Sequence, residues 1–83
     1  MENKTALKIL RESKGETLSS IARYLNIGVS RYYLIEVGER PATPIIAEKL
    51  AKKLGVKIED IFLPQSFTVR KINKEMASHA INQ

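Results

Sequence analysis

Few side chains in this sequence have the type and spacing that catalysis or metal binding requires. Catalysis would need a nucleophile beside a base, or two carboxylates facing one cleft, and the only adjacent acidic residues near a predicted helix start are Glu59 and Asp60. Neighbouring residues on a helix point in different directions, so this pair suits a helix N-terminus better than acid–base chemistry. The chain has no cysteine to share a metal with its one histidine, His79. The sequence therefore predicts a protein that is not an enzyme and needs no metal or cofactor.

The basic side chains indicate a different chemistry, which is the binding of a polyanion. Fourteen Lys and Arg against nine Asp and Glu give a net charge of +5, a balance typical of proteins that meet nucleic acids. Three tyrosines, Tyr24, Tyr32 and Tyr33, stand among basic neighbours and could stack on single-stranded bases. Packing is the simpler interpretation, with Tyr32 in the core and Tyr24 covering the edge of the second helix, and Tyr33 is the tyrosine that could face DNA.

The length and composition of the chain indicate a single globular domain. Eighty-three residues make one domain with one core, and 43% hydrophobic with 28% charged residues is typical of a globular chain. The apolar runs are far shorter than a membrane span, and the lack of cysteine is compatible with a reducing cytoplasm. We expect a soluble, cytoplasmic protein without a membrane partner.

Apolar residues that recur at helical spacing, together with helix start and stop signals, predict five helices. The helical segments cover residues 5–14, 17–26, 29–37, 43–55 and 58–63. Thr17 and Thr43 are the expected N-caps of the second and fourth helices, and Pro44 occupies a first helical position, where proline is favoured. Asn26 and Gly28 are expected to adopt the left-handed backbone that makes a tight turn between the second and third helices.

The chain after the last helix leaves two interpretations open. Phe67, Val69 and Lys71 alternate with polar and apolar neighbours like a half-buried strand, whereas Ile72, Met76 and Ala80 are spaced like one helix face. The one plausible boundary lies at residues 64–66, which divides the chain into a domain (1–64) and a C-terminal tail (65–83) that could support dimerisation.

Residues 17–38 combine two short helices with a tight turn, the geometry that presents the second helix to the major groove of DNA. The pattern, with matching residues from Lys4 to Leu63, resembles the Cro/repressor-type helix-turn-helix family, also called the XRE family. The positions that carry the resemblance are Thr17, Ala22, Ile27, Ile35, Glu36 and Gly38. It implies an all-α fold, a compact five-helix, lambda-repressor-like DNA-binding domain with a short C-terminal tail.

The resemblance also implies which residues meet DNA. Base readout falls to the helix at about residues 29–37, at Val29, Ser30, Arg31, Tyr33 and Leu34. Phosphate contacts fall to the start of the second helix and to the loop after the third, at Thr17, Leu18, Ser19 and Arg40. Arg11 and Glu36 match positions that form an internal ion pair in the family.

The chemistry of these positions is that of a helix with few polar base readers. Ser30 can hydrogen-bond either kind of base pair, Arg31 can reach a guanine or a phosphate, and Val29 or Leu34 can rest on a thymine methyl group. The helix has no Gln or Asn for adenine, so phosphate contacts and DNA shape should contribute more to recognition. Leu18 departs from the family pattern, which often has a glutamine there, and is expected to be partly buried or to meet a partner.

The sequence thus predicts sequence-specific binding of double-stranded DNA through a major-groove recognition helix, by a dimeric transcriptional repressor of phage or mobile-element type. Its partners would be a palindromic operator and a second copy of the chain. One alternative is a DNA-binding antitoxin whose tail covers a toxin. Another is a protein-interaction module without a DNA role, which Leu18 and the scarcity of polar base readers would favour.

Overall fold

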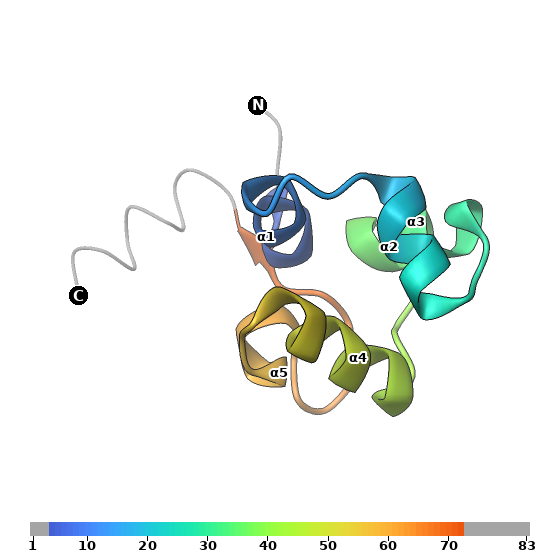
Figure 1. Cartoon of the computed structure of the whole chain (residues 1–83). Coiled ribbons are helices and arrows are strands. Elements are labelled where there is room, and N and C mark those ends of the chain that lie inside the picture. Colours follow the sequence, from blue (N-terminus) through green and yellow to red (C-terminus); the bar gives the residue numbers. More distant parts are fainter. Residues whose placement is uncertain (1–3, 73–83) are drawn as a thin grey trace.

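The computed structural model describes residues 4–72, and five short helices form most of this part of the chain. The helices are α1 (Ala6–Ser13), α2 (Leu18–Leu25), α3 (Val29–Val37), α4 (Pro44–Leu54) and α5 (Ile58–Ile61). Figure 1 shows α2 and α3 together on one side of the molecule, with α1 beside them and α4 and α5 below. The predicted all-helical fold is confirmed.

The helix ends follow the expected capping residues. The Thr17 hydroxyl accepts from the Ser20 backbone N–H, and the Ser20 hydroxyl accepts from the Thr17 N–H, each at 3.0 Å. Thr43 likewise accepts from the Ile46 N–H, with Pro44 in the first turn of α4. These side chains satisfy amides that the first turn of a helix leaves without a helical partner, so α2 and α4 begin where their caps predict.

The turn between α2 and α3 depends on one left-handed residue. Asn26 ends α2 at φ 60°, a conformation that asparagine tolerates. Gly28 instead has an extended backbone, with φ −70° and ψ 152°, and caps α3. The left-handed conformation predicted for both residues is therefore right for Asn26 and wrong for Gly28, because a helix N-cap takes extended angles.

Two predicted helix boundaries need correction. Thr5 does not belong to α1, because its backbone is extended and its side chain caps the helix by accepting from the Lys8 N–H. The last helix ends at Ile61 instead of Leu63, because Phe62 is extended and forms an antiparallel bridge with Val69. Pairing with a residue seven positions further along the chain thus outweighs the helical pattern there.

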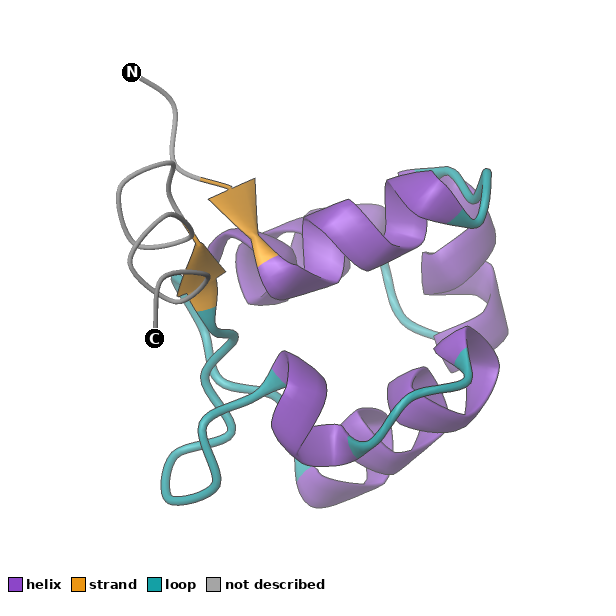
Figure 2. Ribbon diagram, turned by 90° about the vertical axis from the view of Figure 1, so that its left-hand side faces the viewer, coloured by secondary structure: helices purple, strands orange, loops and turns teal. Residues whose placement is uncertain are grey.

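A small sheet joins the two ends of the described chain. Strand β1 (Lys4–Thr5) pairs antiparallel with β2 (Lys71–Ile72), with Thr5 opposite Lys71. Figure 2 shows the two strands side by side at the beginning of α1. The strand interpretation is confirmed for Lys71 and Ile72. It is wrong for Phe67, which has a left-handed backbone with φ 54°, and Val69 forms only an isolated bridge with Phe62. The helical alternative at Met76 and Ala80, and His79, lie outside the described residues.

One core connects all of these elements. Its fully buried apolar side chains come from every helix and from the segment after α5, namely Leu7, Ile21, Tyr32, Ile35, Leu50, Leu54, Ile61, Phe62 and Val69. Ile27 and Leu18 are half-buried and pack against this cluster. Within residues 4–72, no helix has both the length and the apolar character for crossing a membrane.

Candidate nucleic-acid interface

Helix α3 has one buried face and one exposed face. Tyr32, Ile35 and Glu36, spaced three and four residues apart, are buried against the rest of the domain. Val29 and Tyr33, four residues apart, remain 43% and 50% exposed. The helix is therefore fixed from behind while its other side is open to a ligand.

The residues proposed to meet bases lie mostly on this open side. Val29, Ser30, Arg31 and Tyr33 are exposed, whereas Leu34 is half-buried. The backbone carbonyl of Leu34 accepts from the N–H groups of Glu39 and Arg40, at 2.9 and 3.1 Å. Leu34 thus supports the end of α3, and less of its side chain is free for a base.

A buried ion pair anchors the inner face of α3. Arg11 on α1 donates from Nε to Glu36 Oε1 at 2.7 Å and from Nη2 to Oε2 at 3.0 Å. The two residues are 8% and 2% exposed. A two-point contact between a guanidinium and a carboxylate fixes orientation as well as distance. The pair that the family resemblance implies is present and joins α1 to α3.

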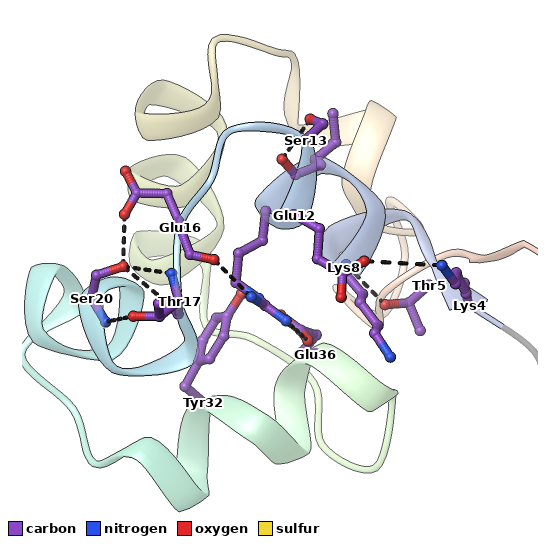
Figure 3. Close-up of polar contacts among 12 residues, drawn as sticks. Lys4, Thr5, Lys8, Glu12, Ser13, Glu16, Thr17, Ser20, Tyr32 and Glu36 are labelled. Atoms are coloured by element: carbon purple, nitrogen blue, oxygen red, sulfur yellow. Dashed lines mark hydrogen bonds and ion pairs between the residues drawn. The ribbon is translucent and has the colours of Figure 1, made fainter.

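Tyr32 completes the anchor, a role that the sequence analysis missed. Its hydroxyl donates to Glu36 Oε1 at 2.8 Å, and Figure 3 shows Tyr32 and Glu36 meeting beneath α1. Burial, reinforced by the Glu36 carboxylate, raises the pKa of Tyr32 far above its ordinary value, so the hydroxyl remains a donor. The signal in the sequence was the four-residue spacing of Tyr32 and Glu36 on one helix face.

Arg11 also reaches the beginning of α2. Its Nη1 donates to the backbone carbonyl of Glu16 at 2.7 Å, one residue before the Thr17 cap. The hydrogen bonds with Glu36 raise the pKa of Arg11, so the guanidinium stays charged. One side chain therefore fixes both α3 and the start of α2, the two elements proposed to approach DNA.

The start of α2 presents hydroxyl and amide groups to solvent. Thr17 and Ser19 are exposed, whereas the Leu18 side chain is half-buried and packs against the core. The backbone amides of Leu18 and Ser19 occupy the first turn, where helices lack internal acceptors. Leu18 can therefore offer its amide to a phosphate, while its side chain supports the fold.

Glu16 adds a negative charge next to these groups. Its carboxylate accepts from the Ser20 hydroxyl at 2.7 Å and lies 3.6 Å from Lys53 Nζ on α4. The Ser20 hydrogen bond lowers the pKa of Glu16. Lys53 also stands 5.0 Å from the ring centroid of Tyr24, within the range of a cation–π contact. Lys53 and Tyr24 thus brace α2 against α4.

Arg40 is exposed in the loop that connects α3 with α4, shortly after the end of α3. The acidic residues Glu59 and Asp60 lie apart from these groups, in the first turn of α5, where Asp60 accepts from the Lys57 N–H. Between residues 4 and 72, no three His, Cys, Asp or Glu side chains gather in a way that could hold a metal ion. Apart from the carboxylates of Glu16 and Glu39, the solvent-accessible groups on α2, α3 and the following loop are donors and apolar contacts, which suit the surface of a nucleic acid.

Comparison with known proteins gives one match. The family model described as Helix-turn-helix matches residues 7–61. This range includes α1 to α5 except for the first residue of α1. Comparisons with curated proteins and with solved structures gave no significant match.

Proposed function

This chain belongs to the helix-turn-helix family of DNA-binding proteins, and on this premise we propose that it binds duplex DNA sequence-specifically with α3 in the major groove. The observation that supports this most is the division of α3 into an anchored face and an exposed face. The buried hydrogen bonds of Glu36 with Arg11 and Tyr32 hold the helix in one orientation. A helix held in this way presents the same face to the major groove whenever the protein binds DNA.

In this proposal Ser30 and Arg31 supply the polar contacts of the recognition helix. Ser30 hydrogen-bonds a base edge, and Arg31 binds a guanine or an adjacent phosphate. Val29 and Tyr33 form the apolar part of the exposed face, and Val29 suits a thymine methyl group. Leu34 contributes at the margin, because part of its side chain is covered.

Phosphate contacts position the helix in the groove. Thr17, Ser19 and the amide of Leu18 stand at the N-terminus of α2, where the helix dipole favours an anion. Arg40 reaches the backbone from the loop after α3. Such contacts add affinity that is independent of sequence and depends on salt.

We further infer a dimer that represses transcription. A helix of nine residues reaches only a few base pairs, so one copy has limited selectivity. Two copies related by a two-fold axis would place their recognition helices about 34 Å apart, on half-sites of a palindromic operator. Occupying such a site blocks transcription without any catalytic step.

Selection from a random duplex library, at two salt concentrations, tests this proposal. We expect the chain to enrich a two-fold-symmetric site. A Ser30→Ala, Arg31→Ala double variant should bind that site at least ten-fold more weakly, since good base contacts each contribute about 1–3 kcal/mol. The affinity for unrelated duplexes should change much less than the affinity for the enriched site.

Lys52→Ala is the matched control, because it removes one positive charge from an exposed position on α4. It should enrich the same site as the unmodified chain. Weak binding with no enriched site, falling steeply with salt in all three proteins, would show only a basic surface meeting phosphates, and would contradict sequence-specific binding through α3.

A further inference from the structure

The side chain of Lys71 lies over the end of the recognition helix. Gly38 ends α3 at φ 91°, and a Cβ atom added to it would stand 3.1 Å from Lys71 Cε and 3.9 Å from Lys71 Nζ. Val69 Cγ1 would stand 3.5 Å from the same position. The C-terminal segment therefore packs on Gly38 and places an ammonium group where α3 ends.

The backbone on both sides of Lys71 is held in place. Thr5 of β1 pairs with Lys71 itself, and the preceding residue, Arg70, donates to the Ile61 carbonyl and accepts from the Ala6 N–H, each at 2.8 Å. Val69 is buried in the core. The backbone of Lys71 is thus held in place next to α3. Binding a ligand would therefore cost less conformational entropy than it would for a lysine in a loose tail.

Two exposed cations flank this point of the surface. Lys71 stands beside Gly38, and Arg40 follows Gly38 by two residues in the loop toward α4. None of the ion pairs found among residues 4–72 includes either of them. Both charges are therefore available to an anion that approaches the end of α3.

We propose that Lys71 contacts a DNA phosphate and forms, with Arg40, a two-cation clamp at the end of the recognition helix. This inference rests on the proposed function, because a helix lying in the major groove has the sugar-phosphate backbone at its margins. Lys71 lies outside the residues that match the family model, 7–61. The contact would be supplied by this chain's own C-terminal segment instead of by the helix-turn-helix unit.

A purely structural role for Lys71 makes a different prediction. A positive charge near the last turn of a helix stabilises the helix through its dipole and its free carbonyl groups. In that case removing the charge would lower the stability of α3 and the affinity for DNA together, without changing how affinity depends on salt. The salt dependence therefore separates a phosphate contact from stabilisation of the helix.

The test compares Lys71→Met with Lys52→Met in the full chain. Methionine keeps an apolar stem over Gly38 while it removes the charge, and Lys52 lies about 12 Å along α4 from Pro44, the end of the helix that adjoins the Arg40 loop. Dissociation constants would be measured for the enriched duplex and for an unrelated duplex, between about 50 and 200 mM salt. Circular dichroism would give the melting temperature of each variant.

For Lys71→Met, we expect the slope of log affinity against log salt to become less steep by about 0.9, which corresponds to one phosphate contact. At about 0.15 M salt the affinity should fall roughly five-fold on both duplexes, because a phosphate contact carries no sequence information. Lys71→Arg should retain the original slope, and Lys52→Met should leave both quantities close to those of the unmodified chain.

An unchanged slope in Lys71→Met, or the same change in Lys52→Met, would overturn the phosphate contact while leaving the proposed function intact. A fall in affinity that accompanies a lower melting temperature, with no change of slope, would also overturn it in favour of the structural role. If the unmodified chain shows no preference for any duplex, the proposed function fails and this inference fails with it.

Discussion

Replacing Glu36 by alanine is expected to destabilise the domain by about 3–5 kcal/mol, because the change leaves a buried guanidinium without its carboxylate. Arg11 is 8% exposed and makes two of its three hydrogen bonds with Glu36. The Tyr32 hydroxyl would also lose its acceptor. A domain of this size has a total stability of the same order, so the variant should be largely unfolded at 37 °C. Urea denaturation followed by circular dichroism measures the effect.

Glu12→Ala is the appropriate control for this change. Glu12 pairs with Lys4 at 4.0 Å, and both side chains are about half exposed. Surface pairs of this kind contribute at most about 1 kcal/mol, so this variant should unfold close to the unmodified chain. A loss below about 1 kcal/mol in Glu36→Ala as well would mean that Arg11 regains solvent without disturbing the domain, and the pair would then not be the anchor of α3.

The helices could be predicted from the sequence because their limits depend on nearby residues. Thr17 and Ser20 are three residues apart and cap each other, and Thr43 with Pro44 starts α4 by the same local chemistry. The bounds of α3, Val29–Val37, agree with those predicted from its flanking glycines. In each of these cases the determining contact spans no more than four residues, which is the range over which the pattern of a single sequence carries information.

The remaining structure depends on contacts that span more residues than a helical pattern covers. The sequence predicts the end of α5 at Leu63, two residues beyond its actual end at Ile61. The reason is that Phe62 pairs with Val69, a bridge that the helical pattern of residues 58–63 does not reveal. The pairing of β1 with β2 joins Thr5 to Lys71, across 66 positions of the chain. Two-residue strands are too short to produce a clear alternation, so their partners could not be identified from the sequence.

The candidate site divides in the same way. The pairing of Arg11 with Glu36, 25 residues apart, came from the family resemblance, since no spacing rule connects the two positions. The third contact of Arg11, with the Glu16 carbonyl, involves a backbone atom, so no residue type in the sequence indicates it. The sequence places Lys71 in an alternating tail and gives no sign of its position over Gly38, because that position depends on the long-range pairing of β2.

Removing residues 65–83 is expected to abolish cooperative folding. The shorter chain loses Val69, which is 2% exposed, and uncovers Phe62, which is fully buried. It also loses five backbone hydrogen bonds that residues 67–70 make with Ala6, Ala42, Ile61 and Leu63. Each large side chain contributes about 1.5–3 kcal/mol on burial, so the loss is on the order of 5 kcal/mol, comparable with the stability of a small domain. Thermal melts by circular dichroism would compare the truncated chain with the full chain.

Single substitutions make the same comparison without shortening the chain. Val69→Ala should lower the free energy of unfolding by about 2 kcal/mol, since it removes buried methyl groups from the core. Thr68→Ala, at a half-buried neighbouring position, should stay within about 0.5 kcal/mol. If the chain ending at Pro64 melts at the temperature of the full chain, the helices alone hold the core together. The segment that carries Lys71 would then add nothing to the stability of the domain, and the position of Lys71 beside α3 would depend on its own contacts with Gly38 and β1.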